Sequence, residues 1–233
     1  MSEQFSAIVV AMVGAATVIL VVGAVLKRAR RLSGERAMRA TERGWIYTQA
    51  SKSGPAYAVE GSADGFKWRL VVKAGQKGHT SAEWRSEELA TGGAVVGVMS
   101  RAAAALFKSP LATKAAQWGM SLVPAGDPRA QAFERLLEGS VGVDTGDGDF
   151  QKVFGVLATD EGEARRLLTP EVRRALLEWH GTTRRKAGGG SLTVTWSGAG
   201  VSVSWGTGLE EPDAMVRFAE MGLLIGRALK PGW

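Results

Sequence analysis

The stretch Leu192-Thr-Val-Thr-Trp-Ser-Gly-Ala-Gly-Val-Ser-Val-Ser-Trp205 decides the fold class of this chain. Hydrophobic and polar residues alternate with a period of two on both sides of the turn at 198–200, which is typical of two strands joined by a tight turn. Such alternation places one set of side chains on a buried face and the other set on a polar face. We therefore predict an antiparallel hairpin whose buried side chains are Val194, Trp196, Val201 and Val203.

The first half of the chain carries four short runs that are rich in aromatic and β-branched residues, and turn residues separate them. The third run, Phe66-Lys-Trp-Arg-Leu-Val-Val72, alternates in the same way as the hairpin. These runs predict an antiparallel meander over residues 45–48, 57–60, 66–72 and 82–85. A further strand is expected at 94–99, whereas residues 91–126 as a whole lack a clean period.

Capping signals predict several helices after residue 127. Asp127-Pro128 combines an N-cap with a proline at the first helical position, and Asp160-x-x-Glu163 resembles a capping box. Thr169-Pro170 and Pro212 open two later helices, and 150–158 reads as a strand. Helices mixed with hairpins predict an α+β domain with packed helices.

An uncharged stretch of 22 residues, Phe5 to Leu26, predicts a transmembrane helix, because it would rise about 33 Å. The cations that follow it, Lys27, Arg28, Arg30 and Arg31, predict retention on the cytoplasmic side and contact with anionic headgroups of the lipid bilayer. We therefore expect a single-pass protein of the inner membrane, with its N-terminus outside and its C-terminal domain in the cytoplasm.

The charge distribution divides the chain into expected parts. Residues 27–43 hold seven basic and two acidic residues, which leaves a nearly neutral domain from Gly44 onward and argues against nucleic-acid binding. The expected parts are a tail (1–4), the transmembrane helix (5–26), a basic helix broken near Ser33-Gly34 (27–43) and an α+β domain (44–233), with a possible sub-boundary near 123–127.

One region of the second half resembles a known family. The residues are Asp149-Phe-Gln-Lys-Val-Phe154-Gly-Val156, Asp160, Ala164-Arg-Arg-Leu-Leu-Thr-Pro170 and Leu176-Leu177. This F-x-V…D…A-x-x-LLTP pattern resembles uncharacterised bacterial membrane-anchored proteins of the galanin-like, domain-of-unknown-function type, over residues 149–229. No activity and no functional residues carry over from this resemblance.

Candidate chemistry is sparse. Cysteine is absent, so thiol catalysis and sulfur-ligated zinc are excluded, and no cofactor is expected. Asp144, Asp147 and Asp149 form a D-x-x-D-x-D loop that could hold calcium or magnesium, although the spacing does not match an EF-hand and a solvated acidic loop is the simpler interpretation. Tryptophans on the predicted strands either fill the core or line an aromatic groove: Trp45, Trp68, Trp84, Trp196 and Trp205.

Three functional hypotheses follow from the sequence. The first is a non-enzymatic interaction or scaffold domain, an accessory subunit of a membrane complex with a protein partner or a second copy of itself. The second is a lipid or small-ligand binding domain at the membrane surface. The third is an enzyme whose site is built on Asp144, Asp147 and Asp149.

Overall fold

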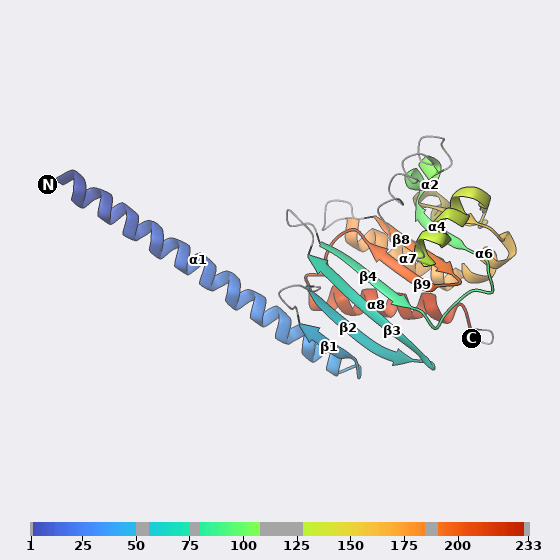
Figure 1. The fold of residues 1–233 in the computed structure, drawn as a ribbon, viewed down its shortest axis with the longest axis horizontal. Helices are drawn as coiled ribbons and strands as arrows, with labels where there is room; N and C mark the ends of the chain where they lie inside the picture. The colour runs from blue at the N-terminus through green and yellow to red at the C-terminus, as the bar shows by residue number, and fades with distance from the viewer. Residues whose placement is uncertain (1, 50–55, 75–79, 108–127, 185–190, 231–233) are drawn as a thin grey trace.

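The computed structural model describes residues 2–49, 56–74, 80–107, 128–184 and 191–230, with the backbone alone over 2–20 (Figure 1). Its centre is one nine-stranded antiparallel sheet of order β1-β2-β3-β4-β9-β8-β5-β7-β6. The strands are β1 Ile46–Gln49, β2 Tyr57–Ala63, β3 Phe66–Ala74, β4 Thr80–Ser86, β5 Val96–Ser100, β6 Val141–Gly142, β7 Phe154–Ala158, β8 Leu192–Ser197 and β9 Gly200–Trp205.

Helices complete the α+β fold. They are α1 Ser2–Thr41, α2 Arg101–Phe107, α4 Pro128–Gly139, α5 Gly148–Val153, α6 Glu161–Leu167, α7 Pro170–Arg184 and α8 Pro212–Arg227. The predicted α+β class, the meander and the hairpin are confirmed, because β1 to β4 pair in sequence and β8 pairs with β9. The expected sub-boundary near 123–127 lies outside the described residues.

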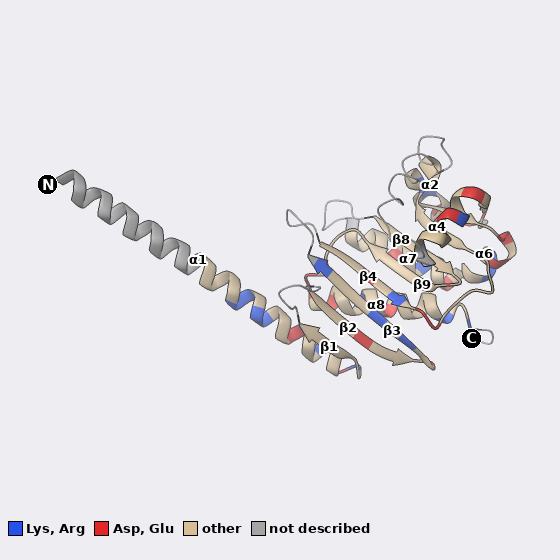
Figure 2. Cartoon of the chain, viewed as in Figure 1, with Lys and Arg blue, Asp and Glu red and all other residues tan. Residues whose placement is uncertain are grey.

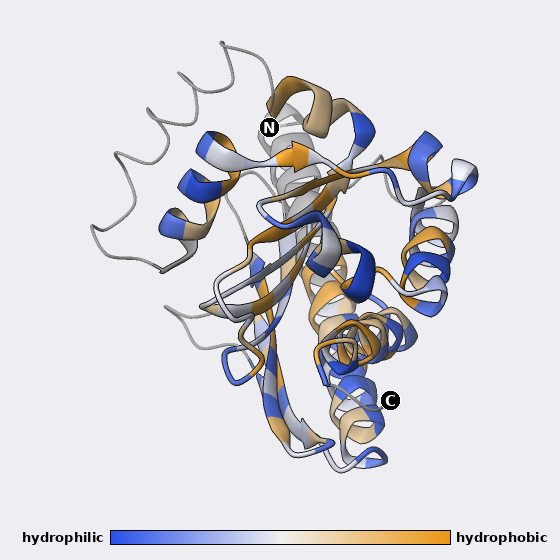
Figure 3. Cartoon of the chain, turned by 90° about the vertical axis from the view of Figure 1, so that its right-hand side faces the viewer, coloured by the Kyte–Doolittle hydropathy of each residue, from blue (hydrophilic) through white to orange (hydrophobic). Residues whose placement is uncertain are grey.

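The core lies on one face of the sheet. A row of directly paired residues crosses seven strands and is buried throughout: Val59, Leu70, Trp84, Val203, Val194, Val98 and Val156. Helices α7 and α8 cover this face, and Figure 3 shows them standing on one side of the sheet. Helix α8 approaches the sheet closely at Gly222, where a Cβ would lie 2.4 Å from the ring of Trp84. The main hydrophobic cluster includes residues from Ala40 to Ile225, so both halves of the chain share one core.

The predicted tryptophans belong to this core. Trp84 and Trp196 are 0% exposed, and Trp45, Trp68 and Trp205 are buried as well. Trp45 meets Trp68 edge-on at 4.9 Å between ring centroids, and Trp68 stacks with Trp84 at 6.3 Å. Trp84 lies against Gly222 of α8, and Trp205 meets Trp179 of α7 edge-on at 5.9 Å. Because all five rings are buried, they do not form an open aromatic groove.

The first helix differs from the prediction. Within the part of the chain that the structure describes, no helix is both long enough and apolar enough to cross a membrane. The predicted transmembrane helix over 5–26 is therefore wrong, and so is the single-pass location in the inner membrane that was derived from it.

Helix α1 is also continuous where a break was expected. It runs through Ser33-Gly34 without interruption and ends at Thr41, before Gly44 with its φ of +70°. Its last turns contact the body: Ala40 is fully buried, and the Ser33 hydroxyl lies 3.2 Å from the hydroxyl of Tyr47 in β1. These contacts hold residues 32–41 in one helical direction, which explains why the weak helix former Gly34 does not end the helix.

We predict that Trp196→Ala destabilises the protein by about 3–5 kcal/mol, because truncating a buried aromatic ring removes apolar contacts and leaves a cavity. Thr193→Ala, on the opposite face of the same strand, is the control and should change the free energy of unfolding by less than about 0.5 kcal/mol. Urea unfolding of the full chain measures both. Equal stability of the two variants would contradict the one-sided core.

Candidate functional site

The face of the sheet opposite the buried row, which we call the open face, carries mostly polar residues. One residue along from each buried position, a second row of directly paired residues crosses the sheet: Glu60, Arg69, Arg85, Ser202, Thr195, Gly97 and Leu157. At the Leu157 end, α2 and α4 cover this face and form a small second cluster with Met99, Ala104 and Leu136. The rest of the row, over β2, β3, β4, β9 and β8, is polar, and no helix of the described residues covers it.

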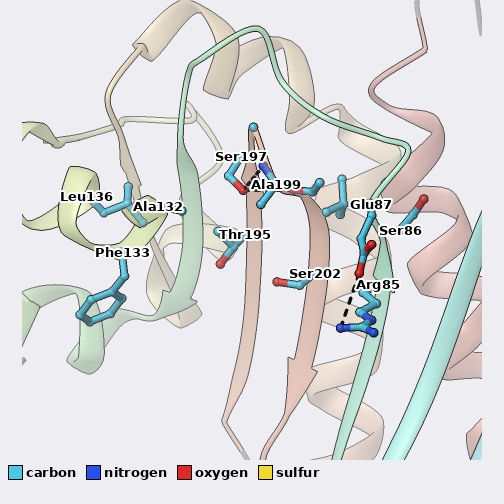
Figure 4. A pocket seen from close by; sticks show the side chains of 13 residues that line it. Arg85, Ser86, Glu87, Ala132, Phe133, Leu136, Thr195, Ser197, Ala199 and Ser202 are labelled. Atoms are coloured by element: carbon cyan, nitrogen blue, oxygen red, sulfur yellow. Dashed lines mark hydrogen bonds and ion pairs between the residues drawn. The ribbon is translucent and has the colours of Figure 1, made fainter. Parts of the chain in front are cut away.

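A groove lies beside α4, at the border between the part of the open face that α4 covers and the polar part. Its volume is about 820 Å³. Figure 4 shows Thr195 and Ser202 on neighbouring strands, between Arg85 on one side and the α4 side chains Phe133 and Leu136 on the other. The groove therefore has an apolar wall, a floor of hydroxyl groups and one guanidinium at its far rim.

The hydroxyl groups that line the groove differ in whether the fold already gives them a hydrogen-bond partner. Ser86 donates to the carbonyl of Lys67 at 2.6 Å, and Ser197 accepts the backbone N–H of Ala199 at 3.2 Å, so both are occupied by the fold. Thr195 and Ser202 are half-buried and have no hydrogen-bond partner within the described part of the chain. A half-buried hydroxyl without a protein partner is free to bind a ligand or water.

The turn of the β8–β9 hairpin closes one end of the groove. Gly200 has a φ of +110°, and a Cβ there would lie 2.2 Å from the carbonyl oxygen of Ser86. Only glycine permits both this backbone conformation and this approach to β4. The turn thus fixes the distance between the hairpin floor and the Arg85 rim.

The carboxylate groups of the acidic loop do not converge on a common point. Asp144 accepts hydrogen bonds from the backbone of Gly146 at 2.8 Å and from the side chain of Gln151, and the Gly146 N–H is the main cause of its lowered pKa. Among the described residues, no group of three or more acidic or histidine side chains could hold a metal ion. The candidate metal ligands Asp144, Asp147 and Asp149 are thus individually engaged.

Asp147 and Asp149 have separate structural contacts. Asp147 caps α5 by accepting the N–H of Phe150, which is the main cause of its lowered pKa, and it pairs with Arg173 at 3.1 Å. Arg173 also donates to the carbonyl of Leu168 at 2.7 Å, so this pair ties α5 to α7. Asp149 pairs with Lys152 on the surface, where its side chain is 82% exposed.

The four predicted membrane-contact cations lie on the part of α1 that projects from the body (Figure 2). Lys27, Arg28, Arg30 and Arg31 are all exposed, and Arg31 lies 3.5 Å from Glu35. The preceding apolar side chains are exposed as well, from 50% at Val22 to 61% at Val25. The structure places these cations far from the groove, so the chain has two separate candidate surfaces.

The fold and the groove define a class: an α+β protein whose antiparallel sheet is covered by helices on one face and is largely open on the other. No family model matches the chain, and no curated protein matches it. Among solved structures, the chain is similar to the mycobacterial trehalose monomycolate transport factor A, TtfA, with 14% identity and a TM-score of 0.41 over 85% of this chain and 92% of that one. At these values the likeness carries no argument about function.

The groove could not be identified from the sequence. Arg85, Ser202 and Thr195 stand on strands that the sequence predicted, but nothing in their spacing indicates that β4 pairs with β9. Phe133 and Leu136 lie in a helix whose position over the sheet has no local signal. The resemblance to uncharacterised membrane-anchored proteins, the absence of catalysis and the protein partner stay predictions.

We predict that Gly200→Ala destabilises the protein by about 1–3 kcal/mol, because alanine at positive φ is strained and its Cβ would collide with the backbone of β4. Gly198, in the same turn, is the control, because a Cβ there would meet no atom within 4 Å. Gly198→Ala should shift the free energy of unfolding by less than about 1 kcal/mol. Thermal unfolding monitored by circular dichroism distinguishes the two variants.

We also predict that the stability contribution of Asp147 depends on pH. Since its folded pKa is lowered, the contribution is fully present above the ordinary carboxyl pKa of about 3.9 and is lost as the pH falls through the folded value. Asp147→Ala should therefore lower the melting temperature clearly at pH 7, and the gap to the unsubstituted protein should narrow below about pH 4. Asp149→Ala, with its exposed carboxylate, should show a small gap at both pH values.

Proposed function

We propose that the protein is a binding module for a small amphiphilic ligand, which lies in the groove between α4 and the β8–β9 hairpin. The observation that carries the proposal is that apolar side chains and hydroxyl groups line different parts of the same groove. Phe133 and Leu136 offer apolar contact on one side. The hydroxyls of Thr195 and Ser202, which have no hydrogen-bond partner among the described residues, offer hydrogen bonds on the floor. Ligand sites commonly combine an apolar lining with a few polar groups that fix orientation.

The size of the groove supports a small molecule over a protein partner. A volume of about 820 Å³ lies within the range of about 300–1,000 Å³ that is usual for small-ligand sites. The floor is also rigid, because Thr195 and Ser202 face each other across the paired strands β8 and β9. Their opposite faces carry Val194, Trp196, Val201 and Val203, which are buried in the core. A ligand would thus meet hydroxyls whose positions are fixed before it binds, which lowers the entropic cost of binding.

We predict that 1-decanoylglycerol, a neutral amphiphile, binds the full chain below its micellar concentration, as measured by isothermal titration calorimetry. Ser202→Phe should weaken this binding by at least about tenfold, because the ring would occupy the floor of the groove. Ser204→Phe is the matched control: it lies on the same strand and face, but it does not line the groove.

The control also separates the groove from other apolar surfaces. Binding of the probe to the exposed Val21–Leu26 segment of α1 would be equally strong in both variants. Circular dichroism of both variants checks that the sheet is intact. If the unsubstituted protein and both variants bind the probe equally, or if none of them binds it, the proposed function is contradicted.

A second role is favoured by the exposed cations of α1. Lys27, Arg28, Arg30 and Arg31 lie beside exposed Val25 and Leu26, and such a combination attracts anionic lipid headgroups at about 1 kcal/mol per well-placed cation. We propose that this part of α1 rests on an anionic lipid surface without crossing it.

We predict that the full chain binds vesicles of phosphatidylcholine and phosphatidylglycerol in equal parts more tightly than vesicles of phosphatidylcholine alone. Replacement of the four cations by glutamine should remove this difference, and added salt should weaken it, because exposed charges are screened. Vesicle co-sedimentation gives the readout. Preference for the anionic vesicles that survives the fourfold replacement would contradict this role.

A further inference from the structure

The charges beside the groove are arranged in an unusual way. Arg69 of β3 and Arg85 of β4 are directly paired across the two strands, on the open face of the sheet. Directly opposed side chains have Cβ atoms about 4.5–5.5 Å apart, and two like charges at this separation destabilise the strand pair. A group of opposite charge beside them, from the protein or from a ligand, would relieve this repulsion.

The protein balances the two arginines unequally. Glu60, the direct partner of Arg69 on β2, forms an ion pair with it, with 3.0 Å between the carboxylate oxygen and the Arg69 Nε. Among the described residues, the nearest carboxylate oxygen to Arg85 is that of Glu87, at 3.7 Å, which is too long for a hydrogen bond. The Glu87 side chain is also 73% exposed, and ion pairs at that exposure contribute little. Of the two arginines, Arg85 is thus the one whose guanidinium the described residues satisfy less well.

Arg85 also stands at the junction of two hollows. It borders the groove, and it borders a second hollow of about 310 Å³ that lies over β3 and β4 and includes Arg69. Strand β9 alone separates β4 from β8, so the Cα atoms of Arg85 and Thr195 lie about 10 Å apart. An anionic group at Arg85 therefore leaves room for an attached chain to cross the hydroxyl floor toward Phe133 and Leu136 (Figure 4).

We infer that the ligand of the groove is an anionic amphiphile, whose carboxylate or phosphate is bound by Arg85 and whose apolar chain lies against α4. This inference rests on the proposed function and adds the chemistry of the ligand's polar end. An arginine binds a carboxylate or a phosphate in a bidentate manner, and the anion would replace the distant carboxylate of Glu87. The same anion would relieve the repulsion between Arg85 and Arg69.

The test compares three groups of probes by isothermal titration calorimetry on the full chain. Decanoate and decyl phosphate carry the anion and the chain, 1-decanoylglycerol carries the chain alone, and inorganic phosphate carries the anion alone. Hydrogen bonds to a charged group are stronger than hydrogen bonds between neutral groups. Arg85→Gln should therefore weaken the binding of both anionic amphiphiles by about 10- to 100-fold. The same variant should change the affinity for 1-decanoylglycerol by less than about twofold.

Lys73→Gln is the matched control, because Lys73 is an exposed cation on the same face of β3 and borders neither hollow. It removes one positive charge without changing the rim of the groove, so it should leave all affinities within about twofold. An equal loss of decanoate binding in Lys73→Gln and Arg85→Gln would mean that net charge is responsible, and it would overturn the inference.

The remaining outcomes distinguish the inference from the proposed function. If 1-decanoylglycerol binds in a manner that depends on Ser202, while the anionic probes show neither an advantage nor a dependence on Arg85, the inference fails and the proposed function stands. If inorganic phosphate binds as tightly as decyl phosphate, the site recognises a free anion, and the amphiphile is excluded. If no probe binds, the proposed function fails as well.

Discussion

The contact between the backbone of α8 at Gly222 and the ring of Trp84 is the constraint on which the rest of the structure depends. A Cβ at Gly222 would lie 2.4 Å from the indole, so the helix can approach the sheet this closely only without a side chain there. Trp84 is fully buried beneath it and stacks with Trp68, which in turn meets Trp45. The position of α8 therefore determines how the tryptophans of the first half pack, and the shared core follows from that packing.

The open face is a consequence of this buried face. Successive side chains of a strand point to opposite sides, so a residue beside a core position must face outward. Once Trp84 is seated under α8, Arg85 is fixed on the other side of β4, and the same holds for Ser202 beside Val203 and for Thr195 beside Val194. The core thus positions the rim and the floor of the groove, and Val201 of the main cluster also lines the hollow.

The sequence predicts what depends on neighbouring residues and misses what depends on distant ones. The alternation in 192–205 predicts the hairpin and its buried residues, and the capping signal at Asp160 predicts the start of α6. Trp196 and Trp84 were open to two interpretations, because an aromatic residue on a strand can fill a core or line a groove until the covering helix is known. The pairing of β4 with β9 joins segments more than a hundred residues apart, and α4 reaches the sheet through tertiary packing alone, so neither carries a local pattern.

The order of strands in the sheet has a consequence for how the chain is made. Strand β4, at 80–86, is completed in the sheet by β9, at 200–205, and the core face of both is covered by α8, at 212–227. While the ribosome is still adding the second half, the meander of β1 to β4 therefore has an unpaired edge at β4 and an uncovered face bearing Phe66, Trp68 and Trp84. Contacts this distant in sequence form slowly, and uncovered apolar strands associate with other chains in the meantime. The apolar face of the meander therefore stays open to association with other chains until α8, which ends at Arg227, has been synthesised.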